Sequence, residues 1–138
     1  MYLFMLLLVS LAAAAPAASP AVPPAPVRIN RCHLNYTGGG LVISSVPGAL
    51  HIAFTDIAPK PVSEIAFAVL LDGRREVVND RGTFSTGAQI EHVYDAFRGS
   101  RTRTFKTPQP TCTVESVQFA DGSTWHAPTS PPTATPHT

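Results

Sequence analysis

Charged residues are scarce in this chain of 138 residues. Lysine, arginine, aspartate and glutamate make up 14% of it, and the net charge is +1. Proteins that bind nucleic acid usually carry a broad basic face, so the composition argues against a nucleic-acid partner. The two methionines, Met1 and Met5, both lie in an N-terminal apolar run. Loss of that run leaves no thioether sulfur, which argues against a methionine-based Cu(I) site.

Catalytic motifs are also missing. No two histidines have the spacing of an H-E-x-x-H zinc motif. Ser85 precedes Gly87, but the segment is not G-x-S-x-G and lacks the strand–turn–helix context that exposes a nucleophilic serine. The aspartates in turn-rich sequence are interpreted as caps of local backbone N–H groups; they are Asp56, Asp72, Asp80 and Asp121. The sequence favours a non-enzyme, with no catalytic residue, no cofactor and no metal ligand.

The N-terminal segment predicts export. The apolar stretch from Leu3 to Leu11 is shorter than the ~20 residues that cross a bilayer, and its length suits the core of a signal peptide. It is followed by small residues that suit a cleavage site, although no lysine or arginine precedes it. We therefore interpret residues 1–17 as a signal peptide and expect a secreted or periplasmic protein. No second apolar run of helical length follows, so no membrane span is expected after cleavage.

Proline divides the rest of the chain. Residues 18–26 form a Pro/Ala-rich linker and residues 128–138 form a Pro/Thr-rich tail that is expected to be disordered. Neither segment can build a core, because proline favours extended, semi-rigid chain. Residues 27–127 remain, which is a usual length for one domain.

Within that domain the apolar residues alternate with a period of two. Examples are Cys32, Leu34 and Tyr36, then Leu50, Ile52 and Phe54, then Ile65, Phe67, Val69 and Leu71. Such alternation is typical of strands with one face in a core. The stretch Ile65–Leu71 is apolar on both faces and predicts a central strand. We expect an all-β fold of seven to eight short strands, because no amphipathic helix is evident.

Turn residues separate these strands. Asp72-Gly73 predicts a type I′ hairpin, since both central residues of that turn need a positive φ. Further turns are expected at Gly87 and at Asp121-Gly122. Asn79-Asp80-Arg81-Gly82 is interpreted as another break in the chain.

The run from Ile52 to Tyr94 contains the strongly apolar strand IAFAVLLDG and the later turn TFSTGAQIEHVY. It resembles small immunoglobulin-like modules of bacterial secreted and cell-envelope proteins. The closing TCTVESVQFADGSTW is similar to the last strands of secreted domains. The resemblance implies an immunoglobulin-like antiparallel β-sandwich and no particular activity. Trp125 follows both cysteines, whereas a true immunoglobulin domain places its Trp between them, so the resemblance is to the sandwich in general.

The two cysteines, Cys32 and Cys112, lie near the two ends of the domain. An exported chain meets an oxidising compartment, so we expect them to form one disulfide. Closing a loop of ~80 residues stabilises a fold by roughly 4 kcal/mol on the chain-entropy account.

Three further groups of residues are candidates for function. His33, His51 and His92 fall on expected strands, and a metal cluster assembled from them stays an alternative. The basic segment contains Arg98, Arg101, Arg103 and Lys106, which could contact an anionic surface. Trp125 is expected to be buried and structural, the competing interpretation being an exposed recognition residue.

The leading interpretation is a secreted or periplasmic, non-catalytic β-sandwich that binds a protein or cell-envelope partner. Such a fold binds by adding a partner strand to a sheet edge or through loops at one end. The alternative is a small exported metalloprotein or hydrolase that uses the strand histidines. The sequence leaves the partner's identity and the oligomeric state open.

Overall fold

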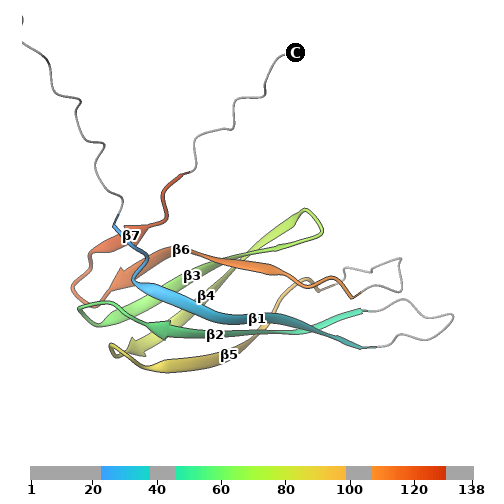
Figure 1. Cartoon of the computed structure of the whole chain (residues 1–138), viewed down its shortest axis with the longest axis horizontal. Coiled ribbons are helices and arrows are strands. Elements are labelled where there is room, and N and C mark those ends of the chain that lie inside the picture. Colours follow the sequence, from blue (N-terminus) through green and yellow to red (C-terminus); the bar gives the residue numbers. More distant parts are fainter. Residues whose placement is uncertain (1–22, 38–45, 99–106, 130–138) are drawn as a thin grey trace, which may run out of the picture.

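The computed structural model describes residues 23–37, 46–98 and 107–129. Within them the chain forms two antiparallel sheets that pack face to face (Figure 1). The seven described strands are β1 (Val27–Thr37), β2 (Val46–Asp56), β3 (Val62–Leu71), β4 (Arg74–Phe84), β5 (Gln89–Asp95), β6 (Thr111–Phe119) and β7 (Thr124–His126). The strand order is β1-β2-β5 in one sheet and β4-β3-β6-β7 in the other. The expected all-β sandwich is confirmed.

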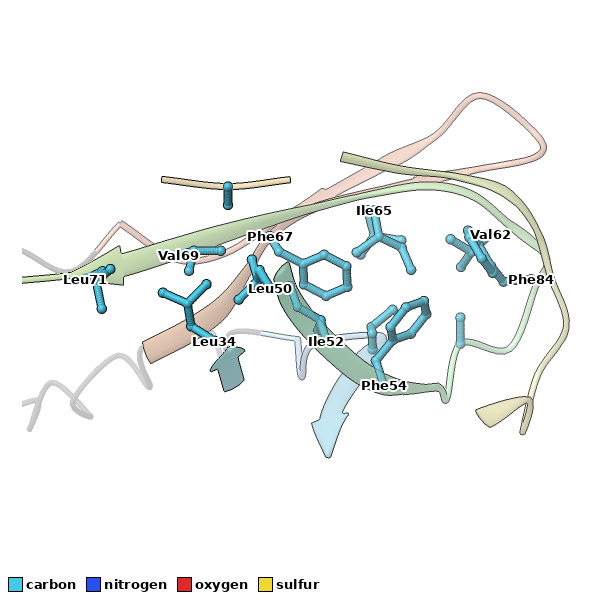
Figure 2. Packing of buried hydrophobic residues seen from close by; sticks show 14 of the residues in the cluster. Leu34, Leu50, Ile52, Phe54, Val62, Ile65, Phe67, Val69, Leu71 and Phe84 are labelled. Atoms are coloured by element: carbon cyan, nitrogen blue, oxygen red, sulfur yellow. The ribbon is translucent and has the colours of Figure 1, made fainter. Parts of the chain in front are cut away.

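The core lies between β2 and β3, where the alternation seen in the sequence becomes an inward-facing row on each strand (Figure 2). Phe54 of β2 contacts Phe67 of β3, with ring centroids 5.3 Å apart. Seven apolar side chains of these two strands are fully buried: Leu50, Ile52, Phe54, Val62, Ile65, Phe67 and Val69. Each contributes roughly 1.5–3 kcal/mol through removal from water.

The strand expected to be central is β3, which pairs with both β4 and β6. Its inward-facing residues are large, whereas the alternate, outward-facing positions hold the small residues Ala66 and Ala68. Leu70, the next residue of that second set, is 48% exposed. The apolar character of both faces therefore reflects a buried inner face and a small-residue outer face.

The predicted turns are present. Asp72 and Gly73 have φ values of 47° and 76°, which are the positive angles that a type I′ turn requires. Gly87 and Gly122 also have positive φ, in the connections before β5 and β7.

The break expected at Asn79–Gly82 is wrong, because β4 runs without interruption from Arg74 to Phe84. Asp80 faces inward opposite the buried Ile65. Two side chains of β5 hydrogen-bond to its carboxylate, which therefore caps no turn. The glycine belongs instead to a register shift, since Val62 pairs with Phe84 while Glu64 pairs with Arg81. A bulge of this kind tolerates glycine within a strand.

The Cys32–Cys112 disulfide is confirmed, with the two Cα atoms 6.1 Å apart. It joins β1, an edge strand of the three-stranded sheet, to β6 of the other sheet. The cross-link therefore closes one long side of the sandwich. The opposite long side lies between β4 and β5.

No helix in the described part of the chain is long and apolar enough to cross a membrane.

Candidate functional site

The outer face of the three-stranded sheet carries a compact set of polar side chains. His33 of β1 lies directly opposite His51 of β2, which in turn lies opposite Val93 of β5. In the neighbouring row Ala53 lies between Arg31 and Glu91. The outer face of the three-stranded sheet therefore carries Arg31, His33, His51, Ala53, Glu91 and Val93.

The two histidines of this face stack on each other. Their ring centroids are 4.6 Å apart and the ring planes differ by 17°. His51 Nε2 lies 3.0 Å from the side-chain nitrogen of Asn35, so it accepts that hydrogen bond and leaves Nδ1 protonated. This Nδ1 is 3.8 Å from a carboxylate oxygen of Glu91. His33 Nδ1 is buried and has no hydrogen-bond partner.

Arg31 and Glu91 form an ion pair of 2.9 Å over Ala53. The pair spans the middle strand because alanine leaves room above it. Both partners are well exposed, so the pair contributes at most ~1 kcal/mol. An open trough of about 500 Å³ lies here, lined by Asn30, Arg31, Ala53, Gln89, Ile90 and Glu91.

His92 lies on the opposite face of the same sheet. It pairs with the fully buried Ile52, so its side chain points toward the sandwich interior. The three strand histidines therefore do not converge. The described residues contain no group of three or more His, Cys, Asp or Glu side chains that could hold a metal ion.

His92 takes part in a polar contact between the two sheets. His92 Nδ1 lies 2.6 Å from Asp80 Oδ2, and the Tyr94 hydroxyl donates to the same oxygen at 2.7 Å. Burial and the Asp80 carboxylate raise the pKa of Tyr94, so the phenol keeps the proton that it donates. We call these three residues the Asp80 cluster.

An Asp–His contact also occurs in hydrolases, where the carboxylate orients the imidazole toward a nucleophile. Among the described residues, no hydroxyl or thiol side chain hydrogen-bonds to His92. The Asp80 cluster instead links β4 to β5 on the long side that has no disulfide. The sequence analysis did not predict this cluster. One signal was present, because Asp80 continues the every-second-residue series of Glu76 and Val78, whose side chains face inward.

Among the residues that the structure describes, no strand pairs with the outer long edge of β5. β5 pairs with β2 on one side and is the last strand of its sheet. Its outward side chains are Gln89, Glu91, Val93 and Asp95, and Val93 is 59% exposed. A large apolar side chain on an unpaired edge is a recognised docking feature.

The basic segment is described only at its first residue. Arg98 is exposed and pairs with Asp95, which raises the pKa of its guanidinium. The charge of Arg98 is therefore partly satisfied within the chain. Arg101, Arg103 and Lys106, the other three expected anion contacts, lie outside the described residues.

Trp125 is partly buried rather than buried. One part packs against the core, and another part lines a second cavity of about 470 Å³. Its indole N–H donates to the carbonyl of Pro23 in a long hydrogen bond of 3.4 Å. The ring is therefore less buried than the structural interpretation expected, and its packing against the core also makes it less exposed than the competing interpretation requires.

The comparisons with known proteins identify no relative. No family model, no curated protein and no solved structure matches the chain.

Proposed function

We propose that this protein is an exported, non-catalytic interaction module that binds an extended segment of a partner protein along the open edge of β5. The single observation that carries the proposal is the absence, on this edge strand, of the features that protect the other edges. Export is supported by the N-terminal apolar run and by the disulfide, which is compatible with an oxidising compartment.

Each of the other edge strands is protected in a different way. β1 has two register shifts and is cross-linked to β6. β4 has a register shift and carries Arg74, Arg75 and Arg81. β7 is three residues long. Bulges, basic side chains and shortness are the ways in which proteins prevent pairing between sheet edges.

β5 has none of these protections. Its seven residues pair with β2 without a register shift, and they include no proline, lysine or arginine. Its two acidic residues, Glu91 and Asp95, are each paired with an arginine of the same chain. A partner strand would therefore meet a regular row of backbone groups without a strong net charge beside it.

Strand addition also explains the exposure of Val93. A partner strand that extends the sheet places a side chain directly beside Val93, and apolar cross-strand pairs of this kind stabilise by roughly 0.2–1 kcal/mol each. Backbone hydrogen bonds supply affinity in this mode, and alternate side chains supply specificity.

A photo-crosslinking amino acid at position 93 tests this proposal in the organism that makes the protein. We expect a discrete covalent product with one partner protein. The matched control places the same amino acid at Leu70, which has similar exposure, 48% against 59%, but lies on β3 away from any edge. Equal products from both positions, or none from position 93, would contradict the proposal.

A pair of substitutions separates edge pairing from general stickiness. Val93→Lys places a charge that disfavours strand pairing, whereas Val93→Thr keeps a β-branched side chain. We expect the lysine variant to lose the complex and the threonine variant to keep most of it, with equal melting temperatures. Loss in both variants would point to a simple hydrophobic contact.

A further inference from the structure

The cavity beside Trp125 is an apolar groove at the end of the sandwich where the described chain begins. Its walls come from three segments: the N-terminal residues, the β2–β3 connection and the β6–β7 turn. The larger apolar lining side chains are Pro24, Pro26, Ile57, Pro59, Phe119 and Trp125. We call it the Trp125 groove. It shares no residue with the β5 edge, so a role for this groove is independent of the proposed function.

One wall of the groove is already an extended proline segment. The indole N–H of Trp125 donates to the carbonyl of Pro23, and the carbonyl of Pro26 accepts from the backbone N–H of Ile57 at 2.9 Å. Polyproline backbone makes no internal hydrogen bonds, so its carbonyls are free for such donors. Aromatic-lined grooves recognise proline-rich segments in this way.

The rest of the groove is open. Ile57 at its rim is 49% exposed, whereas Phe119 beneath is 8% exposed. The ammonium group of Lys60 lies 4.4 Å from the centroid of the Phe119 ring and is already paired with Asp121. The unfilled part therefore offers mainly apolar and aromatic surface beside Ser123 and Thr124, and Lys60, the one cation among its described lining residues, is neutralised. That surface suits an uncharged, proline-containing chain.

We propose that the C-terminal segment of this same chain, residues 130–138, returns to the Trp125 groove and places Pro136 in it. The segment has the sequence SPPTATPHT, with three prolines and no acidic residue, lysine or arginine. Its composition therefore matches the surface that the groove leaves open. It follows Trp125 closely in the chain, which gives an effective concentration in the mM range.

The segment is long enough to return to the groove. The backbone N–H of Ala127 donates to the carbonyl of Glu115, so the chain after β7 runs back along β6, away from Phe119. Returning from Thr129 to the level of Phe119 takes roughly 20 Å at ~3.3 Å per strand residue. Nine residues of polyproline chain span about 28 Å at ~3.1 Å each. About one polyproline turn, Pro136 with His137 and Thr138, therefore remains for the groove.

Trp125 is the only tryptophan of the chain, so its fluorescence reports the groove directly. The test compares the full chain with a variant that carries Pro131→Ala, Pro132→Ala and Pro136→Ala. We expect red-shifted emission and about twofold stronger acrylamide quenching in the variant, because occupancy at mM effective concentration is then lost. A control with Thr133→Ala and Thr135→Ala should match the unmodified chain. Melting temperatures measured alongside show whether the fold is unchanged.

Added peptide and dilution distinguish the occupants. A synthetic peptide of residues 130–138 should restore the blue-shifted emission of the proline variant, and it should shift an Ile57 methyl resonance. Identical emission and quenching in the proline variant and the unmodified chain would overturn the proposal. The proposal would also be overturned if the difference in emission and quenching between the two chains disappears on dilution, because the occupant would then be the tail of a second copy.

Discussion

At the scale of single residues, the carboxylate of Asp80 is the main polar contact between β4 and β5. Its side chain is 6% exposed and accepts hydrogen bonds from His92 and Tyr94. A buried carboxylate must be paired or hydrogen-bonded, because an unpaired buried charge is strongly unfavourable. Asp80 therefore has a structural role that the turn-like sequence around it conceals.

Asp80→Ala should lower the free energy of unfolding by about 2 kcal/mol, because two hydrogen bonds to a charged acceptor are lost. Urea denaturation measures the change. The matched control is Asp95→Ala, which removes an exposed carboxylate paired with the exposed Arg98 and should have little effect. A cost for Asp80→Ala no larger than that of the control would show that the Asp80 cluster does not hold the two sheets together.

Asp56 is a second buried carboxylate, with a different environment. It is fully buried at the end of β2. Its Oδ1 accepts from the backbone N–H of Ala58 at 2.8 Å, while Oδ2 has no partner. Burial raises its pKa above the ordinary 3.8, although the hydrogen bond from Ala58 opposes the rise.

The raised pKa makes stability depend on pH. Just above pH 3.8 the folded chain keeps a proton on Asp56 that the unfolded chain releases. This contribution to stability is complete below pH 3.8 and is lost as the pH rises through the folded pKa. Asp56→Asn keeps the acceptor for Ala58 and does not titrate. The variant should therefore gain stability relative to the unmodified chain between acid and neutral pH. Urea denaturation at several pH values measures the free energy of unfolding of both chains. Parallel plots of that free energy against pH would contradict the prediction.

At the scale of elements, the β3–β4 hairpin depends on local backbone chemistry. Asp72 and Gly73 both adopt positive φ, a conformation that costs most side-chain-bearing residues roughly 1–2 kcal/mol. A Cβ atom at Gly73 would have no neighbour within 4 Å. Any cost of substitution there is therefore conformational and not steric.

Gly73→Ala should destabilise the fold by about 1 kcal/mol. Gly73→Asn should cost less, because asparagine tolerates this region of backbone conformation. Thermal unfolding of the two variants gives the comparison. Equal losses would indicate that something other than φ limits this position.

At the scale of the whole molecule, the two long sides of the sandwich are closed by different chemistry. Cys32–Cys112 holds β1 to β6, and the Asp80 cluster holds β4 to β5. The covalent side has a protected edge strand, whereas the hydrogen-bonded side has the open edge of β5. The surface that we propose for partner binding therefore lies on the side without a covalent cross-link.

Replacing both cysteines, Cys32→Ala and Cys112→Ala, should lower the free energy of unfolding by roughly 4 kcal/mol, given the loop of about 80 residues that the bond closes. Denaturation of the variant and of the oxidised chain measures the loss. Thiol titration of the unfolded, unreduced protein should find no free thiol. Two free thiols, or a covalent dimer, would contradict the intramolecular bond.

Local sequence was sufficient for much of this architecture. Alternation at Leu50, Ile52 and Phe54 indicates a strand with one buried face, because successive side chains point to opposite sides. Asp72-Gly73 specifies its turn through backbone energetics alone. With only two cysteines in the chain, one intramolecular pairing exists. Each of these inferences depends on near neighbours in sequence or on simple counting.

Only the tertiary structure decided the rest. Alternation does not say which strands become edges, so the exposure of β5 could not be derived from its sequence. His33 and His51 meet because β1 and β2 pair in one register, and His92 is turned to the other face by its own phase. Asp80 lies within β4 and not in the expected turn, and its carboxylate accepts hydrogen bonds from His92 and Tyr94 of β5. Contacts between strands distant in sequence are set by register and by the packing of two sheets, and no local pattern encodes them.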